Sequence, residues 1–273
     1  MSCNSLTKQL FDSNSDHVTA LVLPEGVTAP TNVSETEIGR AFWYTDITSV
    51  DFPSTLTVAT GFNHCSSLAS IDISKCTNLT TIGRFGFGEC SNLVFDVSNL
   101  PQTVTSIEDS AFHGCSKVTG ALNLPNATYI GGSAFESTGI TAVSGIGTIT
   151  RINYRCFRAT RITSINIPNT CTYIGEAALA DINTLTTVTG GSNVTEIGNW
   201  GFSACTNLTS INSLSNIRTV GTEAFKNCTS LTGVINLSNV TSIGDGAFNG
   251  CSVFDVGTTL NMPNLTSLGS NAF

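Results

Sequence analysis

The chain has 273 residues and a formal net charge of −8, and only 11% of its residues are charged. This acidic balance argues against a nucleic-acid partner, because such binding needs many Lys and Arg side chains to displace counterions from phosphates. No stretch approaches 18 consecutive apolar residues, so membrane insertion is not expected. With so few charges, Ser, Thr and Asn must supply most of the polar surface.

Residues 1–36 differ from the remainder of the chain. Met1 to Lys8 lack the apolar core of a secretory signal, and Asp12 to Asp16 are polar. Val18 to Pro24 read as one irregular strand. Because a stacked array needs a polar cover over its apolar end, we interpret residues 1–36 as an N-terminal cap or docking segment.

From residue 37 to residue 273, a landmark apolar residue recurs every 20 to 25 residues. Such a narrow spread indicates one supersecondary unit copied many times, and no unit can bury its apolar residues alone. Residues 37–273 are therefore predicted to form one solenoid of about ten units plus a truncated last unit. The landmarks are Phe42, Phe62, Phe87, Phe112, Phe135, Phe157, Leu179, Phe202, Phe225, Phe248 and Phe273.

Most units follow all or part of the pattern hydrophobic-Gly-x-x-small-Phe-x-x-Cys, then an apolar stretch. Ile243, Gly244, Ala247, Phe248 and Cys251 form a clean copy. The Gly is expected where the chain needs a positive φ or a close backbone contact. Alternating apolar residues after the Cys predict a strand, and a second short segment before the next Gly predicts another. A compact helical or 3₁₀ turn is expected to carry the small residue and the Phe.

The run Thr-Ser-Ile-Gly-Asp-Gly-Ala-Phe-Asn-Gly-Cys-Ser, from Thr241 to Ser252, resembles the BspA-type leucine-rich repeat. The resemblance covers nearly the whole chain from about Glu37. It implies a leucine-rich-repeat solenoid, a right-handed superhelix with a ladder of parallel β-strands and short helical or 3₁₀ turns. It also implies a family of bacterial, protist and phage-encoded proteins mostly associated with adhesion to proteins or cell surfaces.

Most of the ten cysteines repeat in phase with the units. Six lie three residues after the landmark, where a small, readily buried side chain fits: Cys65, Cys90, Cys115, Cys205, Cys228 and Cys251. Cys3, Cys76, Cys156 and Cys171 lie out of phase, and a bridge among these four stays open. The sequence holds no C-x-x-C pair and no Cys/His cluster at zinc spacing, so neither a metal nor a cofactor is expected.

Nothing in the sequence demands an enzyme. His64 and His113 flank landmark residues two coils apart, and the neighbouring sequence offers no acid to orient either imidazole. The fingerprints of nucleophilic hydrolases, phosphate-binding loops and dinucleotide-binding proteins are absent. The nine N-x-S/T tripeptides follow from a repeat rich in Asn, Ser and Thr, so they are weak evidence for glycosylation.

Departures from the repeat are the candidate binding residues. Trp43 and Tyr44, with Trp200 as an echo, suit protein contact or sugar stacking, or they cover the first coil as part of a cap. An arginine run occupies the middle of the chain and could grip carboxylates or sulfates, or it is a solvated face of one odd coil. The run contains Arg151, Tyr154, Arg155, Arg158 and Arg161.

The last unit stops at Phe273 with nothing polar to close the stack. We therefore predict that further residues follow, or that a partner subunit contacts this end.

Two function classes result. The first is a non-enzymatic adhesion module that binds a protein or glycan, on a cell surface or as a phage virion component. The second is an architectural spacer or assembly protein whose ends alone matter.

Overall fold

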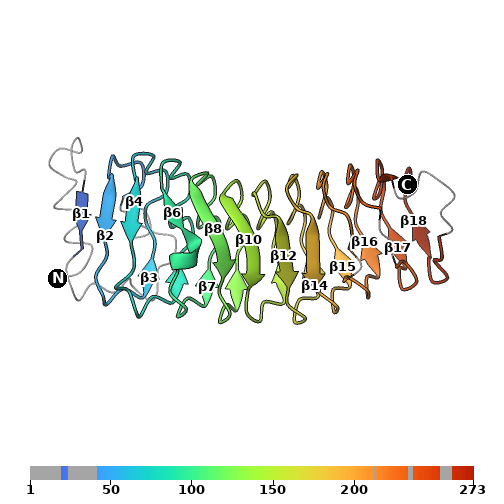
Figure 1. The fold of residues 1–273 in the computed structure, drawn as a ribbon, viewed down its shortest axis with the longest axis horizontal. Helices are drawn as coiled ribbons and strands as arrows, with labels where there is room; N and C mark the ends of the chain where they lie inside the picture. Colours follow the sequence, from blue (N-terminus) through green and yellow to red (C-terminus); the bar gives the residue numbers. More distant parts are fainter. Residues whose placement is uncertain (1–19, 24–41, 212, 233–235, 253–259) are drawn as a thin grey trace.

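The structure is a computed structural model that describes residues 20–23, 42–211, 213–232, 236–252 and 260–273. Figure 1 shows a rod in which successive coils lie side by side, from β1 at one end to β18 at the other. Every strand pair is parallel, and each strand pairs with the equivalent strand of the neighbouring coil, as in β15–β16–β17–β18. The predicted solenoid with a parallel strand ladder is confirmed.

Most coils in the described part of the chain supply two strands, one after the Cys position and a shorter one before the Gly position. The first set comprises β1 (Ala20–Val22), β2 (Ser49–Asp51), β4 (Ser70–Asp72), β6 (Phe95–Asp96), β8 (Val118–Asn123), β10 (Gly139–Gly145), β12 (Ser164–Ile167) and β14 (Thr187–Gly190). The second comprises β3 (Val58–Ala59), β5 (Thr81–Ile82), β7 (Ser106–Ile107), β9 (Tyr129–Ile130), β11 (Arg151–Ile152), β13 (Tyr173–Ile174), β15 (Glu196–Ile197), β16 (Thr219–Val220), β17 (Ser242–Ile243) and β18 (Ser267–Leu268).

The strand predicted near residue 20 is present as β1, which pairs with β2 and places Leu21 in the core. Residues 1–19 and 24–36 lie outside the described residues. The cap or docking role of this segment therefore stays a prediction.

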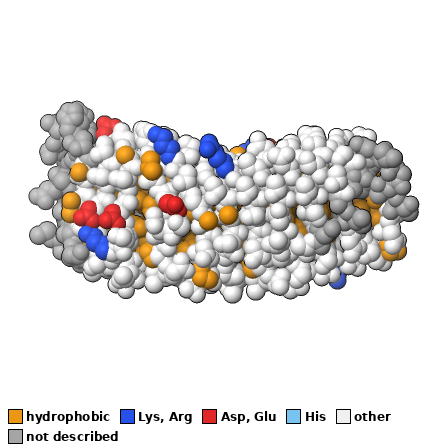
Figure 2. All heavy atoms as spheres, in the orientation of Figure 1, with side chains coloured by type: hydrophobic (Ala, Val, Ile, Leu, Met, Phe, Trp, Pro, Cys, Tyr) orange, Lys and Arg blue, Asp and Glu red, His pale blue; other side chains and the backbone are white. Residues whose placement is uncertain are grey.

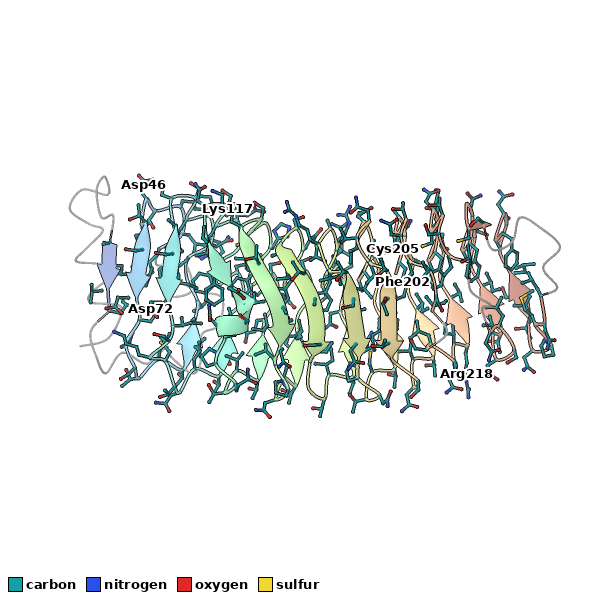
Figure 3. The ribbon with its side chains drawn as sticks, viewed as in Figure 1. Asp46, Asp72, Lys117, Phe202, Cys205 and Arg218 are labelled. Carbon is teal, nitrogen blue, oxygen red and sulfur yellow. The ribbon has the colours of Figure 1, made fainter. Side chains whose placement is uncertain are left out.

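The landmark side chains form a continuous interior. Ten of the landmarks are buried, and neighbouring phenylalanine rings stack with centroids 5.1 to 5.8 Å apart. Leu179 interrupts the series, so the rings form two stacks, Phe42 to Phe157 and Phe202 to Phe273. Phe202 and Cys205 lie within the rod, whereas Lys117 and Arg218 lie on its opposite edges (Figure 3).

The corner that carries the Phe is not the helical or 3₁₀ turn expected from the sequence. Its backbone N–H groups alternate between two kinds of acceptor. Those of Ser110 and Phe112 donate to carbonyls of the following coil, whereas those of Ala111 and His113 close tight turns within their own coil. A helix would need every donor for its own ladder, so the forward bonds exclude it. The helical element η2 (Val97–Asn99) instead follows β6.

The backbone near the Phe meets two different requirements, a close contact between coils at the Gly and a positive φ on either side of the Phe. The repeated Gly is required by close contact: a Cβ added to Gly131 would lie 2.4 Å from the backbone nitrogen of Asp109 in the preceding coil. Positive φ values instead occur two residues before and two residues after the landmark, mostly at residues other than Gly. Ser110, Arg155 and Trp200 illustrate the first of these positions, and Ala159 the second. Of the two reasons predicted for the Gly, close contact is the correct one.

The in-phase cysteines form a buried ladder of free thiols. Each donates its S–H to the carbonyl of the landmark residue in the preceding coil; for example, Cys115 Sγ lies 2.9 Å from Phe87 O, and Cys205 Sγ lies 3.0 Å from Leu179 O. Cys76, Cys156 and Cys171 are also free and buried, so the bridge left open among the out-of-phase cysteines is not found for these three. Cys3 lies outside the described residues.

Uncharged polar side chains cover much of the exterior. Thr hydroxyls and Asn amides donate mainly to backbone carbonyls of the preceding coil, as in Thr195 to Thr172 and Asn193 to Asn169. The Asn side chains of several N-x-S/T tripeptides are thus engaged in stacking. Figure 2 shows that the face carrying β8 and β10 has few charged side chains.

Candidate functional site

The predicted arginine run winds around one coil, so its members face different surroundings. Arg151 lies on β11, with its guanidinium 4.4 Å from the centroid of the Tyr173 ring. Arg155 and Arg158 flank Phe157 at the corner, and Arg161 is exposed after it. The structure therefore does not bring the four guanidinium groups together in one cluster.

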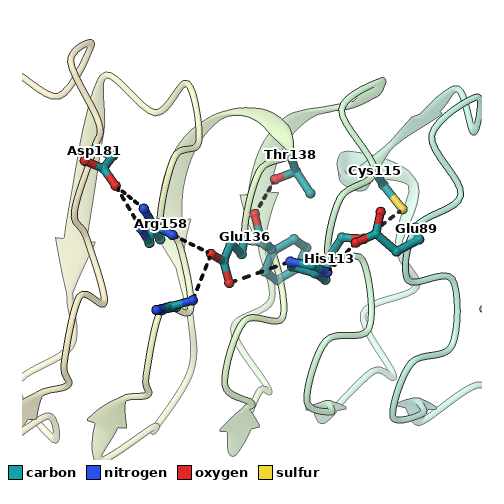
Figure 4. A network of polar contacts seen from close by, with 9 residues as sticks. Glu89, His113, Cys115, Glu136, Thr138, Arg158 and Asp181 are labelled. Atoms are coloured by element: carbon teal, nitrogen blue, oxygen red, sulfur yellow. Dashed lines mark hydrogen bonds and ion pairs between the residues drawn. The ribbon is translucent and has the colours of Figure 1, made fainter.

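A row of ionisable side chains, which we call the charged ribbon, crosses the corners of successive coils (Figure 4). It consists of Glu89, His113, Glu136, Arg155, Arg158 and Asp181. At its centre is Glu136, whose side chain is only 7% exposed. Arg158 donates to Glu136 Oε1 at 3.1 Å and to Asp181 Oδ2 at 2.8 Å. Arg155 Nη1 lies 3.9 Å from the same Glu136 oxygen. Two arginines of the run thus neutralise a nearly buried carboxylate of their own chain.

Burial acts to lower the pKa of Arg158, but the hydrogen bonds and charges of Asp181 and Glu136 outweigh burial, so the pKa is raised. The guanidinium of Arg158 is therefore firmly cationic and already shared between two carboxylates. Recognition of an external anion through Arg158 would have to compete with both of these contacts.

His113 belongs to the same charged ribbon, which the local sequence did not reveal. Its Nδ1 lies 3.0 Å from Glu89 Oε1, and its Nε2 lies 3.8 Å from Glu136 Oε2. The acids come from the preceding and following coils, 24 and 23 residues away. The sequence near His113 offered no acid to orient the imidazole, and stacking of the coils supplies two of them. No group of three or more side chains placed to hold a metal ion is found in the described part of the chain.

The predicted aromatic residues lie in separate places. Tyr44 is 70% exposed and stacks on His64 with centroids 4.6 Å apart, and Trp43 packs edge-on against Phe85. Trp200, far along the rod, donates its indole N–H to Glu223 Oε2 at 3.1 Å. Trp200 therefore does not extend the Trp43 and Tyr44 surface.

The predicted end-contact residue belongs to the second ring stack. Phe273 stacks on Phe248 with centroids 5.6 Å apart, and the residue remains 38% exposed. Its contact with a partner subunit remains a prediction.

Two tyrosines that were not singled out from the sequence lie on the short strands, next to the predicted residues Arg151 and Tyr154. Tyr129 and Tyr173 begin β9 and β13, on either side of Arg151 on β11. Tyr154 follows β11 on the same coil as Arg151. Aligning the units on the Ile before each Gly would have revealed this series, because Tyr129, Arg151 and Tyr173 are 22 residues apart at one repeat position. We call Tyr129, Arg151, Tyr154 and Tyr173 the tyrosine–arginine patch.

Hydrogen bonding holds one ring of the tyrosine–arginine patch in place. Tyr129 donates its hydroxyl to Asp109 Oδ1 at 3.0 Å, and the same oxygen accepts the N–H of Gly132 at 2.8 Å. Burial, and then the hydrogen bond to Asp109, raise the pKa of Tyr129 to about 12. Its hydroxyl therefore remains a neutral donor at ordinary pH.

Comparison with known proteins agrees with this architecture. Residues 36–161 and 150–273 match the family described as BspA type leucine rich repeat region (6 copies). The chain belongs to the BspA-type leucine-rich-repeat family, whose members are commonly surface or adhesion proteins. No curated protein matches the sequence. Among the residues that the structure describes, no helix is long and apolar enough to cross a membrane.

Solved structures of bacterial leucine-rich-repeat proteins are similar at low identity. A leucine-rich repeat protein from Bacteroides ovatus is 21% identical, with a TM-score of 0.37, over 93% of this chain and 84% of that one. A leucine rich cell surface protein from Faecalibacterium prausnitzii is 20% identical, with a TM-score of 0.39, over 92% of this chain and 87% of that one. A leucine-rich repeat protein from Eubacterium ventriosum is 18% identical, with a TM-score of 0.28, over 88% of this chain and 91% of that one.

Proposed function

We propose that this protein is a non-enzymatic binding module that presents its solenoid surface to a protein or glycan of a host or partner surface. Its place of action would be a cell surface or a phage virion. One observation carries the proposal: a single continuous interior contains the landmark side chains. Outward-facing residues such as Tyr154 are therefore free to vary for contact, because the core does not depend on them.

The family supports adhesion over architecture, since its members are commonly surface or adhesion proteins. A spacer would need only matching coils and contacts at its ends. The exposed aromatic residues in the middle of the rod have no use in a spacer. Nucleic acid remains excluded from the proposal on charge, as the net charge of −8 opposes phosphate binding.

The test is direct binding of the purified full chain to intact bacterial and mammalian cells, to extracellular-matrix proteins and to immobilised oligosaccharides. We expect saturable binding to at least one probe, weakened by the double substitution Arg151→Ser and Arg161→Ser. Arg218→Ser is the matched control, because Arg218 is an exposed arginine on another coil. Arg155 and Arg158 are left intact, since they neutralise Glu136. Absence of binding to every probe, together with self-assembly detected by light scattering, would favour the architectural spacer.

A further inference from the structure

The tyrosine–arginine patch is chemically unlike the rest of its ladder. At the repeat position of Tyr129, Arg151 and Tyr173, the other described coils mostly carry Thr or Ser. Three of the four tyrosines of the chain occupy three consecutive coils here. Tyr129 and Tyr154 remain 43% and 44% exposed. The patch is thus an exposed aromatic surface in an exterior otherwise dominated by small hydroxyl and amide side chains.

Contacts within the chain fix the side chains of the patch. Arg151 lies over the Tyr173 ring, and Arg155 lies over the Tyr154 ring with its guanidinium carbon 4.8 Å from the centroid. Asp109 anchors the hydroxyl of Tyr129. Such contacts reduce the conformational entropy that a ligand would otherwise have to remove on binding. The rings are therefore preorganised before any partner arrives.

Gly132 leaves a gap beside these rings. In the neighbouring coils its position is occupied by Asp109 and Tyr154. A Cβ added to Gly132 would lie 3.3 Å from the backbone oxygen of Tyr154, 3.8 Å from Asp109 Oδ1 and 3.9 Å from the Cβ of Tyr154, so the gap is a shallow one that the following coil lines closely. The gap is bordered by a carboxylate on one side and a tyrosine on the other.

The charges around the gap do not select a polyanion. Arg151 and Arg155 are accompanied by Asp109 and by Glu136, which contacts Arg155. What the patch offers is aromatic faces together with closely placed hydrogen-bond donors and acceptors. This combination suits a ligand that has both apolar C–H faces and many hydroxyl groups.

We propose that the tyrosine–arginine patch is a carbohydrate-binding site. A sugar ring lies over the shallow gap at Gly132, stacks its C–H face on Tyr154 and donates a hydroxyl to the Asp109 carboxylate, while the next sugar unit accepts from Arg151. Tyr129 and Tyr173 are two coils, or about 10 Å, apart, so a chain of sugar units spans the patch. This inference rests on the proposed binding function and narrows its partner to a glycan.

The experiment uses the full chain on an array of neutral, uronic-acid-containing and sialylated oligosaccharides, followed by calorimetric titration with the best-bound one. Tyr154→Ala and Gly132→Asn are each expected to weaken binding at least tenfold. The first removes the stacking face, and the second fills the gap while leaving every tyrosine in place. Asn at this position is compatible with the coil, because the equivalent residue Asn199 occurs in the same solenoid. Val94→Ala, a change of an exposed apolar residue on another coil, should leave oligosaccharide binding unchanged.

Melting temperatures of all variants separate a binding defect from a folding defect. Unchanged oligosaccharide affinity in both patch variants would overturn the inference, as would binding of an acidic peptide to the patch in place of any oligosaccharide. A protein or cellular partner that binds equally well to Tyr154→Ala and Gly132→Asn would overturn the carbohydrate site and leave the proposed function standing. No binding to any probe would overturn both.

Discussion

Phe225 and Phe202 provide a direct measure of how much ring stacking stabilises the solenoid. Both side chains are fully buried at the same repeat position. Phe225 stacks between two rings, with centroids 5.3 Å from Phe202 and 5.2 Å from Phe248. Phe202 has a stacked ring on one side only, because Leu179 occupies the equivalent position of the preceding coil.

A stacked aromatic pair contributes about 0.5–1.5 kcal/mol beyond the area it buries. Phe225→Leu removes two such pairs and Phe202→Leu removes one, while both lose the same ring volume. We therefore expect Phe225→Leu to lower the free energy of unfolding by about 0.5–1.5 kcal/mol more than Phe202→Leu does. Leu179 shows that the fold accepts leucine at this position.

Urea denaturation followed by far-ultraviolet circular dichroism measures the difference, with equal m-values as the condition for comparison. Phe157→Leu is an internal control, because Phe157 also borders Leu179 and stacks only on Phe135, at 5.8 Å. Its loss should match that of Phe202→Leu. Equal losses for Phe225→Leu and Phe202→Leu would refute the reasoning, since stacking would then add nothing to burial.

Three further outcomes are expected. Ala159 is exposed with a φ of 55°, so Ala159→Gly should raise the free energy of unfolding by about 0.5–1 kcal/mol. This gain is the left-handed backbone strain that Gly relieves, minus the extra conformational entropy that Gly gives the unfolded chain. A lower urea midpoint for this variant would contradict the prediction. Gly131→Ala should lower the free energy of unfolding by about 1–3 kcal/mol or more, because the added Cβ would lie 2.4 Å from a backbone atom. Gly132→Ala, whose added Cβ would have its nearest neighbour at 3.3 Å, should melt close to the wild type. Equal melting temperatures for the two variants would show that the contact at Gly131 is easily relieved. Burial raises the pKa of the Cys115 and Cys205 thiols to about 12 from an ordinary value near 9.0. The folded state therefore retains protons that the unfolded state releases, and the free energy of unfolding should fall as pH rises from 9 toward 12. Thermal melts of Cys115→Ala should show a shallower fall of melting temperature with pH, and an unchanged dependence on pH would argue against the buried neutral thiol.

The repeat made most of the architecture predictable, because apolar residues that recur at a fixed period can only be buried by stacking. The landmark rings, the paired strands and the buried thiols all follow from that period. The corner was not predictable in the same way. Ser110 and Trp200 adopt positive φ although neither residue type favours it, because the forward hydrogen bonds of the stack impose the conformation.

The candidate site was harder to foresee, since its neighbours are separated by a whole unit. Four nearby arginines suggested one cationic surface, but the coil turns between them, and Glu136 binds two of them. His113 found its acids in adjoining coils. Arg151 and Tyr154 of the tyrosine–arginine patch were predicted, but Tyr129 and Tyr173 were missed because they share a repeat position with Arg151 only when the units are aligned.

The forward direction of the corner hydrogen bonds has a consequence for synthesis. The N–H groups of Ser110 and Phe112 find their acceptors at Gly132 and Ala134, about 22 residues later in the chain. At roughly 5–20 residues per second on a ribosome, each newly made winding waits on the order of 1–5 s for the winding that completes it. Folding of the nascent rod therefore trails elongation by one winding. Duplication of a whole unit in the gene supplies backbone donors and acceptors that already match those of the neighbouring windings, whereas duplication of a partial unit would leave donors and acceptors unmatched.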